Sequence, residues 1–599
     1  MVNVRIALRG AVLAAVAAVT LAACGGGGSG GGGGTSSSGP SGSASASAGG
    51  KGVKGGTLTM LTQQEQLQDL DPQRAYTGRD LAFLNAYLTR SLTSFQMSTD
   101  GTKANTIAPD MATDTGRASD DAKVWSFTIR DGVTWQDGTP VTCADIKYGV
   151  SRTFASSVIT GGPQYAVVFL NIPKAKDGSS IYKGPYDTGA DNTAGIAAFN
   201  KAVTCSADNK TITFNLNQSV GDFNYAVTLG FGAVPKAKDT GAKYTDEIFS
   251  DGPYQIQDYV KGNNLTLVRN PNWQASSDPL RPAYPDKIVV KFGMDSSVID
   301  QTLIKDSFAD QQSLDLDGLV SADLTTVFNN PKIASRAYNG FDPYTLYLSI
   351  DVRKVPSLQQ RMAIAAALDR GALIKIDGGK FAGVPADGAV KPNIGKDYAP
   401  TNMWGGLLGK TIPLSGDPAY AKQLIQESGK PVPTLVYSYA KGPDSDKRAA
   451  AVQLSEARAG IKVQLNPLPS GTFYGIIFNP SRVTALNDLG WGADWPNAST
   501  VIPDLFTPDG GWDVSYVNDP AFNKQVAAAR ALTDRTQQSA AWQKLNTEAS
   551  KNVWIVPTIF ENQQSIAGSR VHSASGPNGA VYLWQPYGCW PFTDLYVSK

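Results

Sequence analysis

The sequence predicts an α/β protein with more than one domain, and three observations lead to this fold class. The chain has 599 residues, which exceeds what one hydrophobic core normally organises, so two or three domains are expected. Hydrophobic residues make up 42% and charged residues 18%, a profile typical of a globular chain. A β-rich run at 434–439, a helical run at 446–459 and a β-rich run at 461–465 form one strand–helix–strand unit, which requires a sheet with helices packed on it.

The first elements of the folded chain follow from the spacing of apolar residues. Residues 56–61 predict a first strand, and Asp71-Pro72 opens a loop. A helix follows, because leucines then recur every three or four residues. This stripe is interpreted as core packing, and it consists of Leu81, Leu84, Leu88 and Leu92.

Residues 109–154 predict a hairpin that leads into a helix. An alternating strand at 125–130 is followed by an Asp-Gly turn, a short second strand at 133–135 and another Asp-Gly turn. The helix then starts near Thr142, with Asp145 in its first turn. Much later, residues 520–551 predict a helical region that is interrupted near 533–535.

The first 24 residues have the features of an export signal rather than of a folded domain. Two arginines precede a 13-residue apolar run at 11–23, which is too short to span a bilayer as a stable helix. The run ends in Leu-Ala-Ala-Cys24, which resembles a bacterial lipobox whose cysteine is lipidated. Glycine makes up 13 of the next 26 residues, so 25–50 is expected to be a flexible linker with a reach of about 25 to 31 Å.

The segment 489–497, Leu-Gly-Trp-Gly-Ala-Asp-Trp-Pro-Asn, has the chemistry of a site for an organic cation. Trp491 and Trp495 flank the carboxylate of Asp494, and a carboxylate with aromatic faces beside it can both pair with an ammonium group and stack against it. The alternative interpretation is an ordinary loop in which the tryptophans are core residues and Asp494 caps a turn.

The sequence offers few residues for catalysis or for metal binding. His572 is the only histidine, and no Gly-x-Ser-x-Gly elbow, Cys-x-x-Cys pair or His-Glu-x-x-His motif is present. Residues 315–318 hint at a calcium loop, but Ser313 and Leu324 stand where an EF-hand needs Asp and Glu. No Walker loop or dinucleotide fingerprint occurs, and a net charge of +1 argues against nucleic acid as a partner. We therefore expect no enzyme, no cofactor and no metal site.

Five ordered segments resemble the peptide- and oligopeptide-binding lipoproteins that serve ABC importers, the solute-binding protein family 5. Residues 490–495 resemble that family's Gly-Trp-x-Ala-Asp-Tyr segment, and 125–148 resembles a signature of the family that is structural and does not contact ligand. The other three segments are 251–273, 358–370 and the returning strand at 554–557. The resemblance extends from about residue 56 to 570.

The resemblance implies a two-lobed periplasmic-binding-protein-like fold of type II, cluster C, with an extra subdomain in the N-terminal half. Mapped onto this chain, lobe one takes 51–95, 221–295 and 556–599, the extra subdomain takes 96–220, and lobe two takes 296–555. Cys143 and Cys205 then share a subdomain, and an oxidising exterior would allow them to pair. That leaves Cys589 odd, and connectivity does not follow from sequence.

By the same resemblance, the protein captures peptides between its lobes and delivers them to an ABC importer permease. Asp494 would receive the ligand's α-ammonium group, and Trp491 and Trp495 would wall side-chain pockets. The peptide would lie extended between a lobe-two strip at 489–491, which includes Gly490, and a lobe-one strip. The lobe-one strip consists of Tyr76, Thr77 and Gly78.

Several points stay open at this level. Trp495 and the following Pro496-Asn497 depart from the family pattern, so the pocket shape is expected to differ. Three cations are candidates for the ligand carboxylate and none carries a motif: Arg336, Arg353 and Lys441. Other branches of the family carry nickel chelates, oligosaccharides or opines, and a surface sensor or an enzyme is a further alternative. The resemblance implies a monomer outside the cytoplasm, anchored by lipid to the outer face of the bacterial cell membrane.

Overall fold

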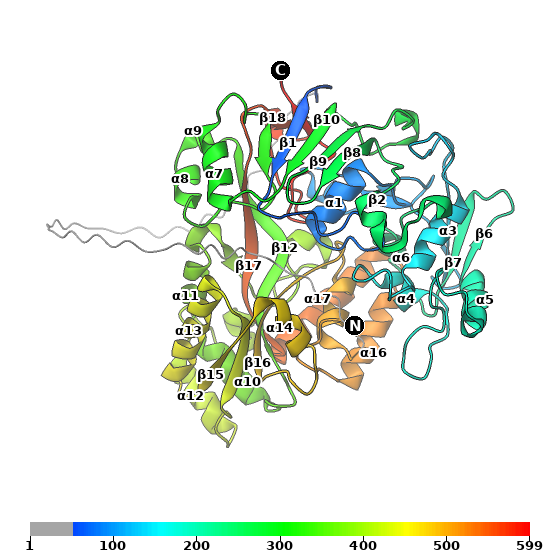
Figure 1. Cartoon of the computed structure of the whole chain (residues 1–599). Helices are drawn as coiled ribbons and strands as arrows, with labels where there is room; N and C mark the ends of the chain where they lie inside the picture. The colour runs from blue at the N-terminus through cyan, green and yellow to red at the C-terminus, as the bar shows by residue number, and fades with distance from the viewer. Residues whose placement is uncertain (1–51, 509) are drawn as a thin grey trace.

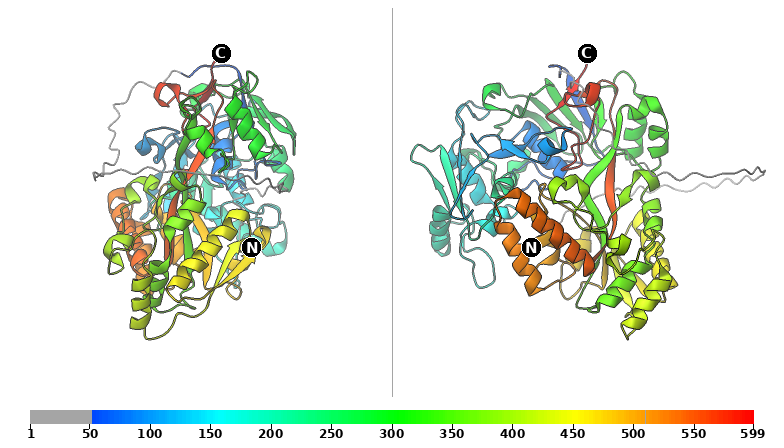
Figure 2. Two further views of the ribbon diagram at one scale, coloured as in Figure 1. Left: turned by 90° about the vertical axis from the view of Figure 1, so that its left-hand side faces the viewer. Right: turned by 180° about the vertical axis from the view of Figure 1, so that it is seen from behind.

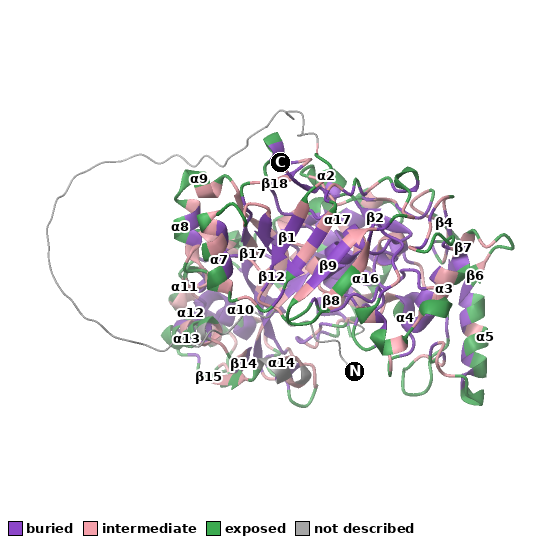
Figure 3. Ribbon diagram, turned by 45° about the horizontal axis from the view of Figure 1, so that its top comes forward, coloured by how far each residue is buried: buried purple, intermediate pink, exposed green. Residues whose placement is uncertain are grey.

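The computed structural model describes residues 52–508 and 510–599, which form two lobes joined by two long strands (Figure 1). The predicted lipidation site Cys24 and the glycine-rich segment 25–50 lie outside the described residues. Within the described ranges, no helix combines the length and the apolar character needed to cross a bilayer. Buried residues concentrate on the central strands, and exposed residues lie on the outer helices and loops (Figure 3).

The first lobe is built on a five-stranded sheet, drawn at the top of Figure 1. Its strands in spatial order are β11 (Ser313–Asp315), β1 (Thr57–Leu61), β10 (Lys287–Lys291), β9 (Asn264–Arg269) and β8 (Tyr254–Val260). β1 pairs in parallel with β10 and β11, whereas β10, β9 and β8 are antiparallel. The predicted first strand is thus confirmed. The helices of this region are α1 (Gly78–Tyr87), α7 (Ser296–Lys305), α8 (Leu324–Phe328) and α9 (Pro331–Ala334).

One expectation for the first lobe needs correction. The predicted leucine helix ends at Tyr87, so Leu88 caps it and Leu92 lies beyond it, although all four leucines are buried as core residues. The family resemblance places 296–336 in lobe two, whereas β11 pairs with β1, and α7 and α8 share an apolar cluster with Leu61. We therefore propose that lobe two begins near residue 337.

The second lobe is built on a six-stranded mixed sheet. Its strands in spatial order are β13 (Gly383–Pro385), β17 (Ile555–Ile566), β12 (Ala337–Ile350), β16 (Leu486–Gly492), β14 (Leu435–Ala440) and β15 (Val463–Leu468). Its helices are α10 (Leu358–Ala367), α11 (Arg370–Ile376), α12 (Pro418–Glu427), α13 (Pro443–Arg458), α14 (Ser470–Ile477), α15 (Ile502–Phe506), α16 (Pro520–Ala531) and α17 (Arg535–Lys551). Because β14 and β15 are parallel and α13 connects them, the predicted strand–helix–strand unit is confirmed. The predicted break near 533–535 separates α16 from α17.

The strands β12 and β17 run through both lobes, as the two views of Figure 2 show. They pair antiparallel from Ala337 opposite Ile566 to Ser349 opposite Ile555. The register shifts between Phe341 and Thr345, so residues 342–344 bulge out of the ladder between the lobes. The predicted returning strand at 554–557 is the start of β17.

A smaller subdomain extends the N-terminal half, at the right of Figure 1. Its sheet has the order β4 (Arg117–Ser119), β5 (Val124–Thr128), β7 (Thr211–Asn215) and β6 (Val203–Cys205), and its helices are α3 (Cys143–Arg152), α4 (Tyr165–Phe169) and α5 (Thr193–Ala202). The predicted second strand at 133–135 is wrong, because only one bridge, Thr134 to Pro140, forms there. Thr142 caps α3 as predicted, and its backbone N–H donates to Asp145 at 2.9 Å.

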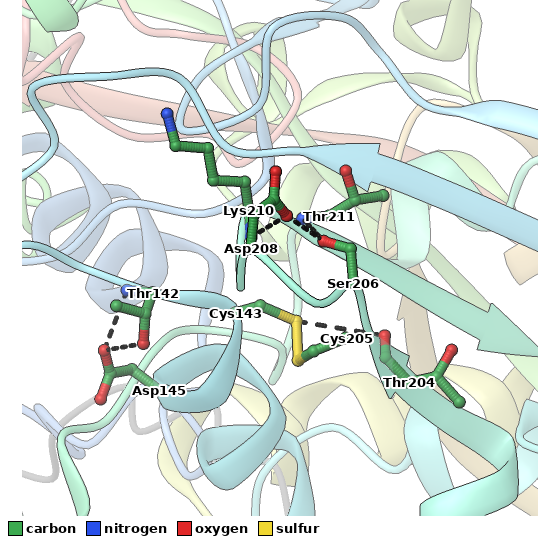
Figure 4. The surroundings of a disulfide bond; sticks show 9 residues. All are labelled: Thr142, Cys143, Asp145, Thr204, Cys205, Ser206, Asp208, Lys210 and Thr211. Atoms are coloured by element: carbon green, nitrogen blue, oxygen red, sulfur yellow. Dashed lines mark hydrogen bonds between the residues drawn. A yellow bond between two sulfur atoms is a disulfide. The ribbon is translucent and has the colours of Figure 1, made fainter.

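A disulfide joins the start of α3 to the end of β6 (Figure 4). Its partners are Cys143 and Cys205, whose Cα atoms lie 5.9 Å apart, whereas Cys589 is a free, buried thiol. Two further antiparallel pairs are β2 (Thr93–Phe95) with β3 (Ile107–Pro109) and β18 (Val571–Ser573) with β19 (Leu595–Val597), and two further short helices are α2 (Gly101–Ala104) and α6 (Phe223–Ala226).

Candidate ligand-binding site between the lobes

The predicted cation-binding segment lies at the end of β16, where the second lobe meets the N-terminal half. β16 pairs with β12 up to Gly492, and Pro496 has no N–H with which to continue a ladder. The loop is held from within lobe two, because the Asp494 N–H donates to Thr500 Oγ1 at 3.1 Å and Asn497 Oδ1 accepts from the Ser499 N–H at 3.0 Å. The sequence thus places Asp494 on a fixed turn rather than on a loose loop.

The carboxylate of Asp494 is bound by two tyrosines from the other half of the protein. Tyr76 Oη donates to Asp494 Oδ2 at 2.7 Å, and the Tyr165 hydroxyl from α4 donates to the same oxygen. Asp494 is only 4% exposed. Burial, followed by the neighbouring Asp494 charge, raises the pKa of Tyr165 well above its ordinary value, so its hydroxyl keeps its proton and donates. The site is therefore shared between the two halves of the protein.

Both tryptophans of the segment are buried and have paired indole N–H groups. Trp491 Nε1 donates to the Thr500 carbonyl at 2.7 Å, and its ring lies 4.8 Å from that of Trp512. Trp495 Nε1 donates across the lobes to Asp222 at 2.9 Å, and its ring lies 4.7 Å from that of Tyr165. Each tryptophan is thus held by a structural hydrogen bond, and both also line a cavity between the lobes.

Two cavities flank the Ala493–Asp494 segment. The first is narrow, with a volume of about 20 Å³, roughly the room of one water molecule. It is lined by Tyr76, Gly78, Leu81, Leu229, Pro343, Tyr344, Gly492, Ala493, Asp494 and Tyr587. The second also has a volume of about 20 Å³ and is lined largely by apolar side chains, Trp491 and Trp495 among them, together with Lys391. Because Pro343 from the bulge of β12 lines both cavities, the strands that join the lobes also form the wall of the site.

The remaining predicted site residues differ in their position. Tyr76 and Gly78 line the first cavity with Asp494, whereas Thr77 caps α1 and donates its N–H to Gln68 Oε1 at 3.0 Å. Gly490 lies inside β16, opposite Leu346, and lines neither cavity. Its place in the sheet indicates a packing role, since a Cβ there would meet the Leu346 side chain at 2.8 Å.

None of the three cations considered for a ligand carboxylate lines these cavities. Arg336 donates to backbone carbonyls of Ala567 and Ile304, and Arg353 pairs with Asp351 at 2.7 Å. Lys441 directly follows β14 and is exposed. The cation at the second cavity is Lys391, which is 4% exposed. Its ammonium pairs with Asp342 at 2.8 Å, and burial lowers its pKa.

Sequence reasoning missed the tyrosines and the carboxylate that complete the site. Tyr165, Tyr587 and Asp222 carry no motif, and each lies far along the chain from Asp494. Tyr587 Oη donates to the Asp494 carbonyl at 3.2 Å. The only histidine, His572, is at a different place, in a groove of the first lobe beside Ser598. Within the described residues, no group of three or more His, Cys, Asp or Glu side chains is arranged to hold a metal ion.

Comparison with known proteins gives one consistent result. The family model described as bacterial extracellular solute-binding proteins, family 5 Middle, matches residues 106–513, which is more than half of the chain. The periplasmic oligopeptide-binding protein OppA of Escherichia coli (strain K12) is 25% identical over 462 residues, which cover 74% of this chain and 77% of the relative. The probable D,D-dipeptide-binding periplasmic protein DdpA of the same strain is 22% identical over 467 residues, which cover 75% of this chain and 78% of the relative.

Similarity to solved structures extends over almost all of the fold. The structure of the clavulanic acid biosynthesis oligopeptide binding protein 2 superimposes with a TM-score of 0.81 at 24% identity, covering 92% of this chain and 97% of that one. The predicted two-lobed α/β fold is thereby confirmed.

Proposed function

Because the chain belongs to family 5 of the bacterial extracellular solute-binding proteins, we propose that it captures short peptides between its lobes and that Asp494 binds their α-ammonium group. One observation carries this proposal. The carboxylate of lobe two that the family resemblance assigns to the ammonium group is buried against Tyr76 and Tyr165 of the N-terminal half, beside a cavity.

The chemistry of this arrangement suits a primary ammonium group. An ammonium group has three donors and no acceptor, so a carboxylate together with phenol oxygens can satisfy it. The hydrogen bonds between them are charge-assisted and gain strength where water is excluded. A ligand here would touch both lobes, so its binding favours the closed arrangement by the extra affinity of that state.

A peptide fits the observations better than a sugar or a metal chelate. Stacking on a sugar would need an accessible tryptophan face, but Trp491 packs on Trp512 and Trp495 packs on Tyr165. The two curated relatives named above are a dipeptide-binding and an oligopeptide-binding protein by their names, which supports a peptide here as well.

The family also suggests where the captured peptide goes. We propose that the loaded protein docks as a monomer on an ABC importer permease, and that lipid on Cys24 anchors it to the outer face of the cell membrane. Peptide uptake by cells that lack the gene tests delivery, since a surface sensor would bind peptide without importing it. Mass spectrometry of peptide incubated with pure protein tests the enzyme alternative, which predicts new products.

Calorimetry with matched peptides tests the site itself. A dipeptide or tripeptide should bind, and its N-acetylated form, which lacks the ammonium group, should bind far more weakly. Asp494→Asn should lower affinity for the free peptide about 10- to 100-fold, the range for a lost charged hydrogen bond, and should remove the discrimination against N-acetylation. Asp488→Asn, in the strand β16 that precedes Asp494, is the control and should keep both properties. Equal binding of free and acetylated peptide would refute the assignment of Asp494.

A further inference from the structure

The carboxylate of Asp222 is buried between the two halves of the protein. It lies just before α6 in the N-terminal half and is 2% exposed. It accepts two hydrogen bonds from lobe two, one from Trp495 Nε1 at 2.9 Å and one from the Ser499 hydroxyl. These partners are 273 and 277 residues away in the sequence. The contact therefore exists only when the halves are together.

Gly221 makes a second contact at the same place, through its backbone. Its N–H donates to the carbonyl of Arg530 in α16 at 3.1 Å. A Cβ at Gly221 would lie 2.3 Å from the carbonyl oxygen of Leu532, which is closer than atoms can approach. Lobe two therefore comes this close only because residue 221 has no side chain.

The groups that satisfy the Asp222 carboxylate change when the lobes close. Among the described residues, its carboxylate forms no ion pair, and Arg535 pairs instead with Asp397 at 3.0 Å. Burial raises the pKa of Asp222. The Ser499 and Trp495 hydrogen bonds act in the opposite direction, as do the more distant charges of Arg535 and Arg530. When the lobes separate, water replaces both donors. The closed state must therefore present Trp495 and Ser499 in the right place, or the buried charge is left unsatisfied.

We propose that Gly221 and Asp222 form a closure clamp and that Asp222 is a positioning residue for the ligand site. Asp222 fixes Trp495, the neighbour of Asp494, and the Trp495 ring packs on Tyr165, whose hydroxyl donates to Asp494. The clamp thus orients the Asp494 carboxylate, which is proposed to bind the ligand, as the lobes close. Its effect on ligand binding rests on the proposed function of Asp494, whereas its effect on closure does not.

Peptide-binding kinetics test the positioning role. Asp222→Asn should increase the dissociation rate constant about 10-fold and leave the association rate constant unchanged. The reason is that the variant lacks the charged acceptor for two hydrogen bonds that exist only in the closed state. Asp251→Asn is the matched control, since Asp251 is also 2% exposed but accepts the Arg90 N–H within the first lobe. The control should lower thermal stability without changing dissociation. Equal dissociation rates for Asp222→Asn and the unmodified protein would refute the positioning role.

A distance measurement tests closure without any ligand. Spin labels on Lys176→Cys and Lys524→Cys report the separation of the extra subdomain from α16, since both positions are exposed and Cys589 is buried. Gly221→Ala should shift the distances to longer values through the clash with Leu532, and Ser499→Ala should do so in part. Unchanged distances in both variants would overturn the clamp. If the two variants lengthen the label distances as expected but the unmodified protein binds no peptide, only the proposed function is contradicted.

Discussion

The hydroxyl of Tyr76 and the carboxylate of Asp494 are 418 residues apart in the sequence and form a hydrogen bond of 2.7 Å between the two lobes. With Tyr165 on the same oxygen, the carboxylate proposed to bind the ligand also joins the halves of the protein. Recognition of the ligand and closure of the lobes therefore involve the same atoms.

Removing the two phenol groups should weaken peptide binding. The double variant Tyr76→Phe with Tyr165→Phe keeps both rings but takes two donors from Asp494, so we expect a loss of roughly 30-fold in affinity at about 1 kcal/mol net for each bond. Calorimetry with a tripeptide measures it. Tyr259→Phe, a partly exposed tyrosine of β8, is the control. Tighter binding by the double variant would mean that the phenols compete with the ligand.

The first cavity requires glycine at residue 78. A Cβ at Gly78 would lie 2.9 Å from Cβ of Tyr587, so Gly78→Ala should push the Tyr587 ring into the cavity and lower peptide affinity. Gly101→Ala is the control because nothing lies within 4 Å of a Cβ there. Calorimetry on both variants should show a loss for Gly78→Ala alone. Unchanged affinity would place the ligand away from this cavity.

The disulfide should stabilise the extra subdomain. Cys143 and Cys205 are separated by 62 residues, and closing a loop of that length removes unfolded-state entropy worth roughly 4 kcal/mol. Cys143→Ser with Cys205→Ser should lower the thermal midpoint in calorimetry. A reductant should lower the midpoint of the unmodified protein and leave that of the double variant unchanged. A reductant effect of equal size on both would indicate another cause.

Glu456 should make stability depend on pH. It is 0% exposed on α13, and within the described residues neither carboxylate oxygen has a hydrogen-bond partner. Burial raises its pKa well above the ordinary value. The folded state therefore holds the proton more tightly than the unfolded state, and stability falls as pH rises above about 4.3, the ordinary pKa of Glu.

Replacing this side chain should remove the penalty. Glu456→Met should raise the free energy of unfolding at pH 7.5 by about 1 to 3 kcal/mol and by less at pH 4.5. Thermal unfolding at the two pH values measures the difference, and Glu427→Met, at an exposed position on α12, is the control. A larger gain in the free energy of unfolding at pH 4.5 than at pH 7.5 would contradict a raised pKa of Glu456.

The sequence by itself determined the elements with strong local signals. The unit β14–α13–β15, the start of α3 at Thr142 and the break between α16 and α17 follow from periodicity, caps and turn residues, which act over a few positions. Asp494 is recognisable in the sequence because Trp491 and Trp495 lie within three residues of it. The short strand expected at 133–135 failed because β5 pairs instead with the distant β7 and with β4.

Only the tertiary structure decided what surrounds Asp494. Tyr165 and Asp222 reach it or its neighbour Trp495 through contacts across hundreds of residues, and no local pattern marks them. Tyr76 is expected from the family resemblance as part of a strip for the peptide, but its hydrogen bond to Asp494 follows only from the fold. The same holds for the place of β11, whose three residues join the first sheet through pairing with β1. Local order depends on neighbours in the chain, whereas a site between lobes depends on how the whole chain packs, so the sequence indicated one carboxylate and the fold supplied its partners.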